Sequence, residues 1–196
     1  MKTLSCILLT VLFTVSANAQ GWRLNTVSAQ TGKTPLSDGI DISATVSDSS
    51  GNSMLLDFSP VQGEMLFFHS VIKNLSFGPT VGFFKNVAWI APVASADFFD
   101  GHFTLLVWIG WSFGNPELGN TSPKLRFCFN YEQATVNVGS YDFYYALLGY
   151  QKFLPENIFG INKSFSLTDH FAAYGGVGYM EQAEEFLWSS GIKYSF

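Results

Sequence analysis

The fold of this chain is decided by its last eleven residues, Phe186-Leu-Trp-Ser-Ser-Gly-Ile-Lys-Tyr-Ser-Phe196. Successive side chains of a β-strand point to opposite faces, so a strand here would have one apolar face, interrupted only by Ser190. That face would carry Phe186, Trp188, Ile192, Tyr194 and Phe196. About ten residues of this pattern are enough for a strand to cross a membrane with one face on lipid. The segment therefore predicts a membrane-spanning β-strand.

The other end of the chain has the features of a secretory signal peptide. Lys2 precedes the apolar run Leu4–Val15, and Ala17-Asn18-Ala19 is a small-x-small cleavage sequence. The apolar run is too short for a transmembrane helix. We expect residues 1–19 to be removed, which leaves residues 20–196 as one domain of 177 residues.

The composition is that of a protein with little water-exposed surface. Aromatic residues make up 17% of the chain and charged residues 13%, against about 25% charged in soluble domains. Loss of Lys2 from the ten basic residues would leave nine against fifteen acidic ones, a net charge of −6. This charge and the lack of a basic cluster argue against a nucleic-acid partner. Cys128 would be the only remaining cysteine, which excludes an internal disulfide.

Apolar segments in the second half of the chain are joined by alternating short and longer connections. The short ones are Asp100-Gly101, Gly139-Ser140 and Thr168–His170, and the longer ones are Gly114–Pro123, Gln151–Glu156 and Glu181–Glu185. In bacterial barrels, short turns face the periplasm and long loops face the exterior. The pattern predicts an all-β protein, a closed antiparallel transmembrane β-barrel with both chain ends on the periplasmic side.

The number of strands must then be even. Segments from Leu75 onward supply eight strands, and a hairpin of Ile40–Val46 with Ser53–Phe58 raises the count to ten, our best count. Adding Trp22–Ala29 and Glu64–Ile72 would give twelve. Eight and twelve strands therefore remain alternatives.

Two residues break the expected strand patterns. Lys163 falls on the same face as Phe159 and Phe165, so either a bulge shifts the register or the lysine snorkels to the membrane surface. Pro92 lies inside Val87–Phe98, where it would remove a ladder hydrogen bond unless the strand bulges.

The opposite faces of these strands should line the barrel interior. Alternation in His102–Phe113 and Lys124–Glu132 separates an apolar face from a more polar one, and charges facing mid-bilayer cost roughly 2–4 kcal/mol each. The predicted lumen-lining residues are Trp108, Lys124, Arg126, Glu132, Asp142, Tyr144 and Lys193. In a narrow barrel, mixed charges pair and fill the lumen; the alternative is a thin polar pathway for small solutes.

The signal peptide, the strand pattern over residues 75–196 and the terminal segment Phe186–Phe196 resemble those of small bacterial outer-membrane barrels of the OmpA and OmpX types. A final strand that ends on Phe resembles the sorting signal of these proteins. The resemblance implies residence in the outer membrane of a Gram-negative-type cell, contact with membrane lipid and lipopolysaccharide, and insertion by the barrel assembly machinery. It specifies neither an activity nor an oligomeric state.

Some small outer-membrane barrels are lipid A-modifying hydrolases or acyltransferases, which use Ser, His and a carboxylate. The candidates here are His69 and Ser70, with Asp57 or Glu64 to orient the histidine; His102 and His170 would lie at the periplasmic rim. The histidines and the cysteine show no metal-ligand spacing, and we expect no cofactor. Our interpretation is a barrel with a structural or surface role, or a small passive channel, without catalysis. The alternatives are a lipid A-modifying enzyme and a secreted soluble β-sandwich.

Overall fold

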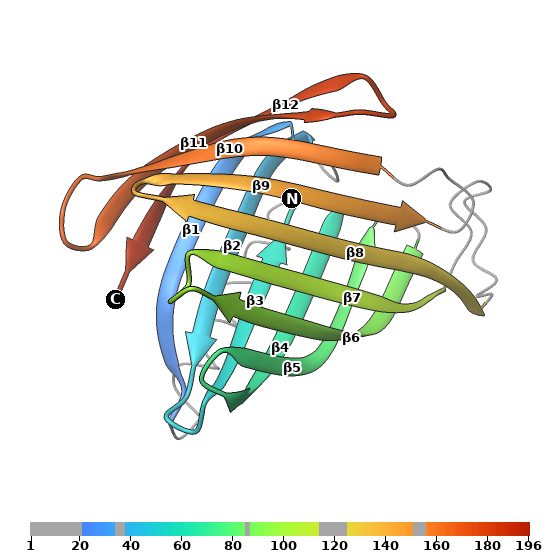
Figure 1. Cartoon of the computed structure of the whole chain (residues 1–196), viewed down its shortest axis with the longest axis horizontal. Coiled ribbons are helices and arrows are strands. Elements are labelled where there is room, and N and C mark those ends of the chain that lie inside the picture. Colours follow the sequence, from blue (N-terminus) through green and yellow to red (C-terminus); the bar gives the residue numbers. More distant parts are fainter. Residues whose placement is uncertain (1–20, 34–37, 85–86, 114–124, 151–155) are drawn as a thin grey trace.

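The computed structural model describes residues 21–33, 38–84, 87–113, 125–150 and 156–196, and these residues form one closed antiparallel barrel (Figure 1). Its twelve strands are β1 (Arg23–Lys33), β2 (Asp38–Ser47), β3 (Asn52–Phe58), β4 (Gln62–Ile72), β5 (Leu75–Phe84), β6 (Val87–Phe98), β7 (Phe103–Phe113), β8 (Leu125–Val138), β9 (Tyr141–Tyr150), β10 (Glu156–Ser166), β11 (Phe171–Met180) and β12 (Glu185–Ser195). No helix among the described residues is long and apolar enough to cross a membrane.

The barrel closes where the first strand pairs with the last. β1 and β12 are antiparallel from Thr26 opposite Ser195 to Lys33 opposite Trp188. The amide of Phe196 also donates to the carbonyl of Asn25 at 2.9 Å. Every described strand therefore has two neighbours, and the start of β1 and the end of β12 lie at the same end of the barrel. Closure removes the unpaired sheet edges that lipid could not hydrogen-bond.

The all-β closed barrel confirms the predicted fold class, but our best count of ten strands is wrong, and the two-sheet sandwich is not the observed fold. The strands left out of that count are β1 and β4. β4 contains Leu66, Phe67 and Phe68 in succession, so its apolar residues do not alternate with polar ones. In β1, polar residues are interspersed with a few apolar ones, and neither face carries a continuous row of large apolar side chains. Pairing with neighbouring strands, rather than local pattern, makes these two segments extended.

Connections at the end that carries the chain termini are all short. They comprise residues 48–51, 73–74, 99–102, 139–140 and 167–170. The other end carries residues 114–124 between β7 and β8, but also short connections such as 59–61. Short and long connections thus alternate only from β7 to β10, because residues 167–170 and 181–184 form two connections of equal length. The predicted signal peptide and Lys124 lie outside the described residues.

The two irregular residues do not cause bulges. Pro92 lies opposite Pro79 of β5, and the β6–β7 register is the same on both sides of it, from Ile90 opposite Trp111 to Val93 opposite Trp108. Only the ladder pairs at positions 91 and 92 are missing from that register. The register of β10 is also unbroken around Lys163, opposite Tyr141 on one side and Gly175 on the other. Lys163 therefore lies on the outer face, without a register shift.

The outer face carries large exposed apolar side chains. They include Ile109, Trp111, Phe143, Phe159, Val177, Trp188 and Ile192. Aromatic pairs lie beside turns at both ends of the barrel: Phe98 with Phe103 and Phe171 with Tyr194 at the end of the termini, and Tyr179 with Phe186 at the other end. This arrangement is typical of the aromatic girdles that border the apolar band of membrane barrels.

We predict that the β1–β12 closure is sensitive to one added methyl group. A Cβ at Gly191 of β12 would lie 2.5 Å from the Ala29 carbonyl oxygen and 2.7 Å from the Tyr174 ring. Gly191→Ala should therefore lower the free energy of unfolding by about 1–3 kcal/mol, since backbone of β1 would have to shift. Denaturant unfolding of the detergent-solubilised protein, followed by circular dichroism, measures this change.

Gly175→Ala on the neighbouring strand is the matched control. Its Cβ would meet only the Ser189 carbonyl oxygen, at 3.4 Å, an ordinary contact. It should change the stability by no more than about 0.5 kcal/mol. Equal effects of the two substitutions would contradict this description of the closure.

Candidate functional site: the inner wall of the barrel

Polar side chains join β1 and β2 across the inner face. Residues opposite each other in the register form side-chain hydrogen bonds: Thr26 with Thr45 at 2.6 Å, Ser28 with Ser43 at 2.6 Å, and Gln30 Nε2 to Asp41 Oδ2 at 3.3 Å. Cross-strand hydroxyl pairs of this kind stabilise a sheet modestly. They also give this part of the wall a hydrogen-bonding surface rather than an apolar one.

Three carboxylates, one each on β2, β3 and β4, extend this polar surface. Asp41, Asp57 and Glu64, which we call the carboxylate row, share the inner face: Asp57 lies opposite Ser43 and opposite Glu64. Thr80 donates its hydroxyl to Glu64 at 3.1 Å. Asp41 is only 7% exposed. Among the described residues, the salt bridge joins Lys33 Nζ to Glu185 Oε2 at 3.1 Å and does not involve the row. The row therefore gives this side of the interior three acidic side chains.

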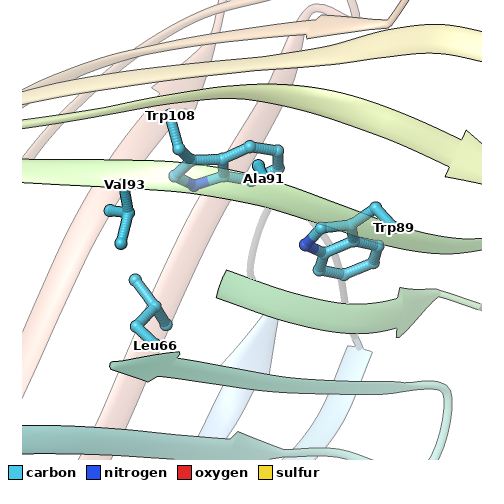
Figure 2. Packing of buried hydrophobic residues seen from close by; sticks show 5 residues of the cluster. All are labelled: Leu66, Trp89, Ala91, Val93 and Trp108. Carbon is cyan, nitrogen blue, oxygen red and sulfur yellow. The ribbon is translucent and has the colours of Figure 1, made fainter. Parts of the chain in front are cut away.

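The adjoining wall is aromatic and apolar. The indoles of Trp89 and Trp108 are parallel within 4°, with ring centroids 6.0 Å apart. They pack with Leu66, Ala91 and Val93, contributed by β4 and β6 (Figure 2). All five residues are buried, so this cluster fills volume beside β4–β7.

On the remaining part of the wall, tyrosine rings lie on glycines. An added Cβ at Gly160 of β10 would overlap the Tyr144 ring, and one at Gly178 of β11 would come within 2.7 Å of the Tyr144 hydroxyl. Tyr174 covers Gly191 of β12 in the same way. Glycine in a strand often marks such a close approach. Because the glycines have no side chains, the rings lie against the wall rather than across the interior.

Tyr174 also faces the polar part of the wall. Tyr174 lies opposite Gly191 of β12, and Gly191 in turn lies opposite Gln30, which is hydrogen-bonded to Asp41. The inner wall is therefore continuous from the glycine-rich strands β10–β12, through the hydroxyls of β1 and β2, to the carboxylate row.

Several of the predicted lumen-lining residues lie on this inner face. Trp108 belongs to the apolar cluster and is 5% exposed, and Tyr144 lies on the glycines. Asp142 is half-buried and lies opposite Asn137 and Asn162. Lys193 is exposed, and its position in β12 lies opposite Ser28.

The other predictions concern β8. Arg126 lies opposite Ser112, and Glu132 lies opposite Val107, but the register shifts between Gly110 and Trp111. An extra residue in one strand reverses the faces beyond it. The single alternation that placed Lys124, Arg126 and Glu132 on one face therefore does not run through β8. The side chains of Arg126 and Glu132 are outside the described part of the chain, and their placement stays a prediction.

The predicted membrane-facing residues of β12 and the terminal residue lie on the outer face. Phe186, Trp188, Ile192 and Phe196 are exposed, whereas Tyr194 is half-buried between rings. Tyr194 makes edge-to-face contacts with Phe171 and Phe196, with ring centroids 4.8 Å and 4.7 Å apart, respectively.

The structure does not assemble the candidate catalytic residues. Consecutive residues of β4 point to opposite faces, so His69 lies with Asn52 and exposed Phe77, whereas Ser70 contacts Ser76 at 3.3 Å. The His69 Nδ1 is 2.8 Å from the Asn52 side-chain oxygen.

Asn52 is itself held by Asp48 in the β2–β3 turn, where its amide and side chain donate to the Asp48 carboxylate. These hydrogen bonds hold the pKa of Asp48 below its ordinary value. The proposed orienting groups, Asp57 and Glu64, are in the carboxylate row on the inner face. His69 also lies at the end of the barrel that carries the termini. No group of three or more metal-ligating side chains occurs among the described residues.

Sequence reasoning missed the principal features of this wall. From the sequence, Asp57 and Glu64 were considered only as candidate partners of His69. Trp89 and Tyr174 were not singled out. The sequence signal for Glu64 is that it falls on the same face of its strand as Leu66, but this signal can be used only when β4 is recognised as a strand. The position of Asp57 opposite Ser43 follows from the register of β2 and β3. The contact of tyrosines with glycines depends on register across three strands.

No family model matches the sequence, and no curated protein matches it either. Solved structures do resemble it. The KdgM porin has a TM-score of 0.55 at 13% identity, and the NanC porin a TM-score of 0.53 at 16% identity. Each comparison covers 89% of this chain and 99% of the porin. A second structure, of the KdgM porin in complex with disordered oligogalacturonate, gives a TM-score of 0.55 at 12% identity and the same coverage.

The barrel is porin-like. The similarity establishes the fold, and the finer expectation of an OmpA or OmpX-type protein is not confirmed. The porin-like barrel extends over almost the whole described chain, from β1 to β12.

We predict that the paired indoles stabilise the barrel from inside. Trp108→Ala would remove a buried ring from the apolar cluster and should lower the free energy of unfolding by about 3–5 kcal/mol. Trp111→Ala removes a ring of equal size from the outer face of the same strand, where the ring is 46% exposed, and should cost clearly less. Denaturant unfolding in detergent, followed by circular dichroism, compares them. A larger loss for Trp111→Ala would contradict the assignment of faces.

Proposed function

We propose that this protein is a passive channel for small solutes in the outer membrane of a Gram-negative-type cell. The observation that carries the proposal is the inner wall of a closed twelve-strand barrel, in which tyrosines lie on glycines beside a row of hydroxyls and carboxylates. These glycines let the tyrosine rings lie flat against the wall, an arrangement that a barrel used only as a membrane anchor does not need. The porin-like fold supports the same interpretation.

The width of the barrel supports a path for solutes. Barrels of eight strands are just wide enough for side chains to fill, and barrels of sixteen or more leave an aqueous channel. Twelve strands lie between these limits, so the volume of the inward side chains decides whether the lumen is open. Four glycines on the inner faces of β10–β12 reduce this volume: Gly160, Gly176, Gly178 and Gly191.

The placement in the membrane rests on the outer face and on the predicted signal peptide. Exposed aromatic and aliphatic side chains cover that face, and aromatic pairs border it at both ends. Contact with lipid and lipopolysaccharide, and insertion by the barrel assembly machinery, follow from this placement. We place the chain termini in the periplasm.

The carboxylate row gives the channel a preference for cations over anions. Carboxylates that line a pore favour cations because they raise the local concentration of positive ions. Oligogalacturonate, with which the KdgM porin is in complex in one structure, is a chain of sugar acids that each carry a carboxylate. We propose that such polyanions are poor solutes for the present barrel.

Planar-bilayer recording of the refolded protein tests the channel directly. We expect discrete conductance steps, and a reversal potential in a potassium chloride gradient that shows preference for potassium. The double variant Asp57→Asn/Glu64→Gln should shift the reversal potential toward zero without abolishing conductance. Protein that is folded but gives no conductance would refute the channel.

Glu184→Gln is the control for charge. It removes one negative charge from the exposed β11–β12 turn, outside the inner wall, and should leave the reversal potential unchanged. An effect as large as that of the double variant would mean that surface charge, rather than the carboxylate row, sets the selectivity.

The placement of His69 and Ser70 argues against the lipid A-modifying alternative, for which they were the candidates. These side chains lie on opposite faces of β4, at the end that we place in the periplasm, away from lipid A in the outer leaflet. We predict that cells expressing His69→Ala have the same lipid A profile by mass spectrometry as cells expressing the unmodified protein. A modification that is lost with His69 would restore the enzyme hypothesis.

A further inference from the structure

One charged residue of the outer face is unexplained by a channel. Lys163 of β10 lies between Phe159 and Phe165 on the face that we assign to lipid, and both rings are about half exposed, at 48% and 53%. Its register is unbroken, so the position is not the by-product of a bulge. A charge at mid-bilayer on this face would cost roughly 2–4 kcal/mol, a cost that falls to near zero at the membrane surface.

The ammonium of Lys163 is held by the protein on one side. Its Nζ donates a hydrogen bond to the Tyr141 hydroxyl at 2.6 Å. It also lies 4.2 Å from the centre of the Tyr141 ring and 4.9 Å from that of Phe165. Among the described residues, the salt bridge joins Lys33 and Glu185, and no carboxylate lies within 4 Å of the Lys163 ammonium. An ammonium has three N–H groups, so its charge and its further donors need an anion or water from outside the described part of the chain.

The contact with Tyr141 sets the depth of this charge. Tyr141 is the first residue of β9 and follows the Gly139-Ser140 turn, at the end of the barrel where the termini lie. The amide of Ser164 donates to the Ser140 carbonyl at 3.0 Å, so β10 runs beside this turn. The lysine therefore directs its ammonium toward the rim of the apolar band, where lysine side chains snorkel to the headgroups.

From this geometry we propose that Lys163 and Tyr141 form a binding site for the phosphate of a glycerophospholipid in the periplasmic leaflet. The proposal rests on the membrane placement given under Proposed function but not on conduction. Because the Tyr141 hydroxyl accepts from the lysine, its own proton is available to a phosphate oxygen beside the ammonium.

The surroundings fit a lipid rather than a small ion. Phe159 lies on the same face as Lys163 but farther from the turn, and it offers exposed apolar surface for the acyl chains. On the β11 side, Gly175 lies opposite Lys163 and places no side chain beside it. A lipid chain is thus free to lie along the strands while its phosphate contacts the two donors.

Native mass spectrometry of the full mature chain, refolded in a neutral detergent and titrated with phosphatidylglycerol, tests the site. We expect Lys163→Gln to weaken binding of the first lipid roughly fivefold, the size of a partly exposed charge pair. Tyr141→Phe keeps the ring but loses the hydroxyl, and it should weaken binding less. Heat-dependent gel mobility establishes that each variant is folded.

Lys73→Gln is the matched control, because Lys73 lies in the exposed β4–β5 turn at the same end of the barrel. It should leave binding unchanged. Equal affinity of Lys163→Gln and the unmodified chain, or an equal loss for Lys73→Gln, would overturn the proposal.

Two further arms identify the source of the phosphate. Inorganic phosphate at millimolar concentration should not displace the lipid, and full displacement would mean a simple anion site instead. Lipid A that binds more tightly than phosphatidylglycerol through Lys163 would overturn the leaflet assignment. Conductance of Lys163→Gln should equal that of the unmodified protein, so failure of the lipid site and failure of the channel are separate results.

Discussion

Pairing of β1 with β12 is the interaction on which the rest of the structure depends. The hydrogen bonds of this ladder give the first and last strands a second neighbour and leave the barrel without an edge. In lipid, an unpaired edge would expose a row of amides and carbonyls with no water to bind them. Closure also separates an outer face, which carries large apolar side chains, from an inner one. Both the channel and the lipid site are consequences of this separation.

The inner wall of the closed barrel differs around its circumference. On β10–β12 the wall is built from glycines covered by tyrosine rings, and on β1–β4 it carries hydroxyls and carboxylates. Between them, Trp89 and Trp108 fill the side near β6 and β7. Bulk and charge are therefore placed on different parts of the wall. A path for solutes would be bounded by aromatic faces on one side and by negative charge on the other.

The outer face follows a simpler rule, and its exception is informative. Apolar side chains cover most of it, apart from positions such as Ser190 and Thr31 where β12 pairs with β1, and aromatic pairs lie near the turns. Lys163 departs from this rule, yet its long side chain carries the charge to the Tyr141 hydroxyl beside a turn. The same physical cost that excludes charge from the apolar band thus directs this side chain to the membrane surface.

The sequence by itself determined the class of fold and the outer face of the last strand, because alternation in Phe186–Phe196 requires no partner to be recognised. It could not determine the strand number: β1 and β4 lack a clear apolar stripe and become strands through the neighbours with which they pair. It also could not assign faces in β8, because the register shift there appears only against β7. Only the tertiary structure brought Asp41, Asp57 and Glu64 together and laid Tyr144 on Gly160 and Gly178. These contacts join neighbouring strands of the barrel, and they depend on a register that hydrogen bonding between the strands decides.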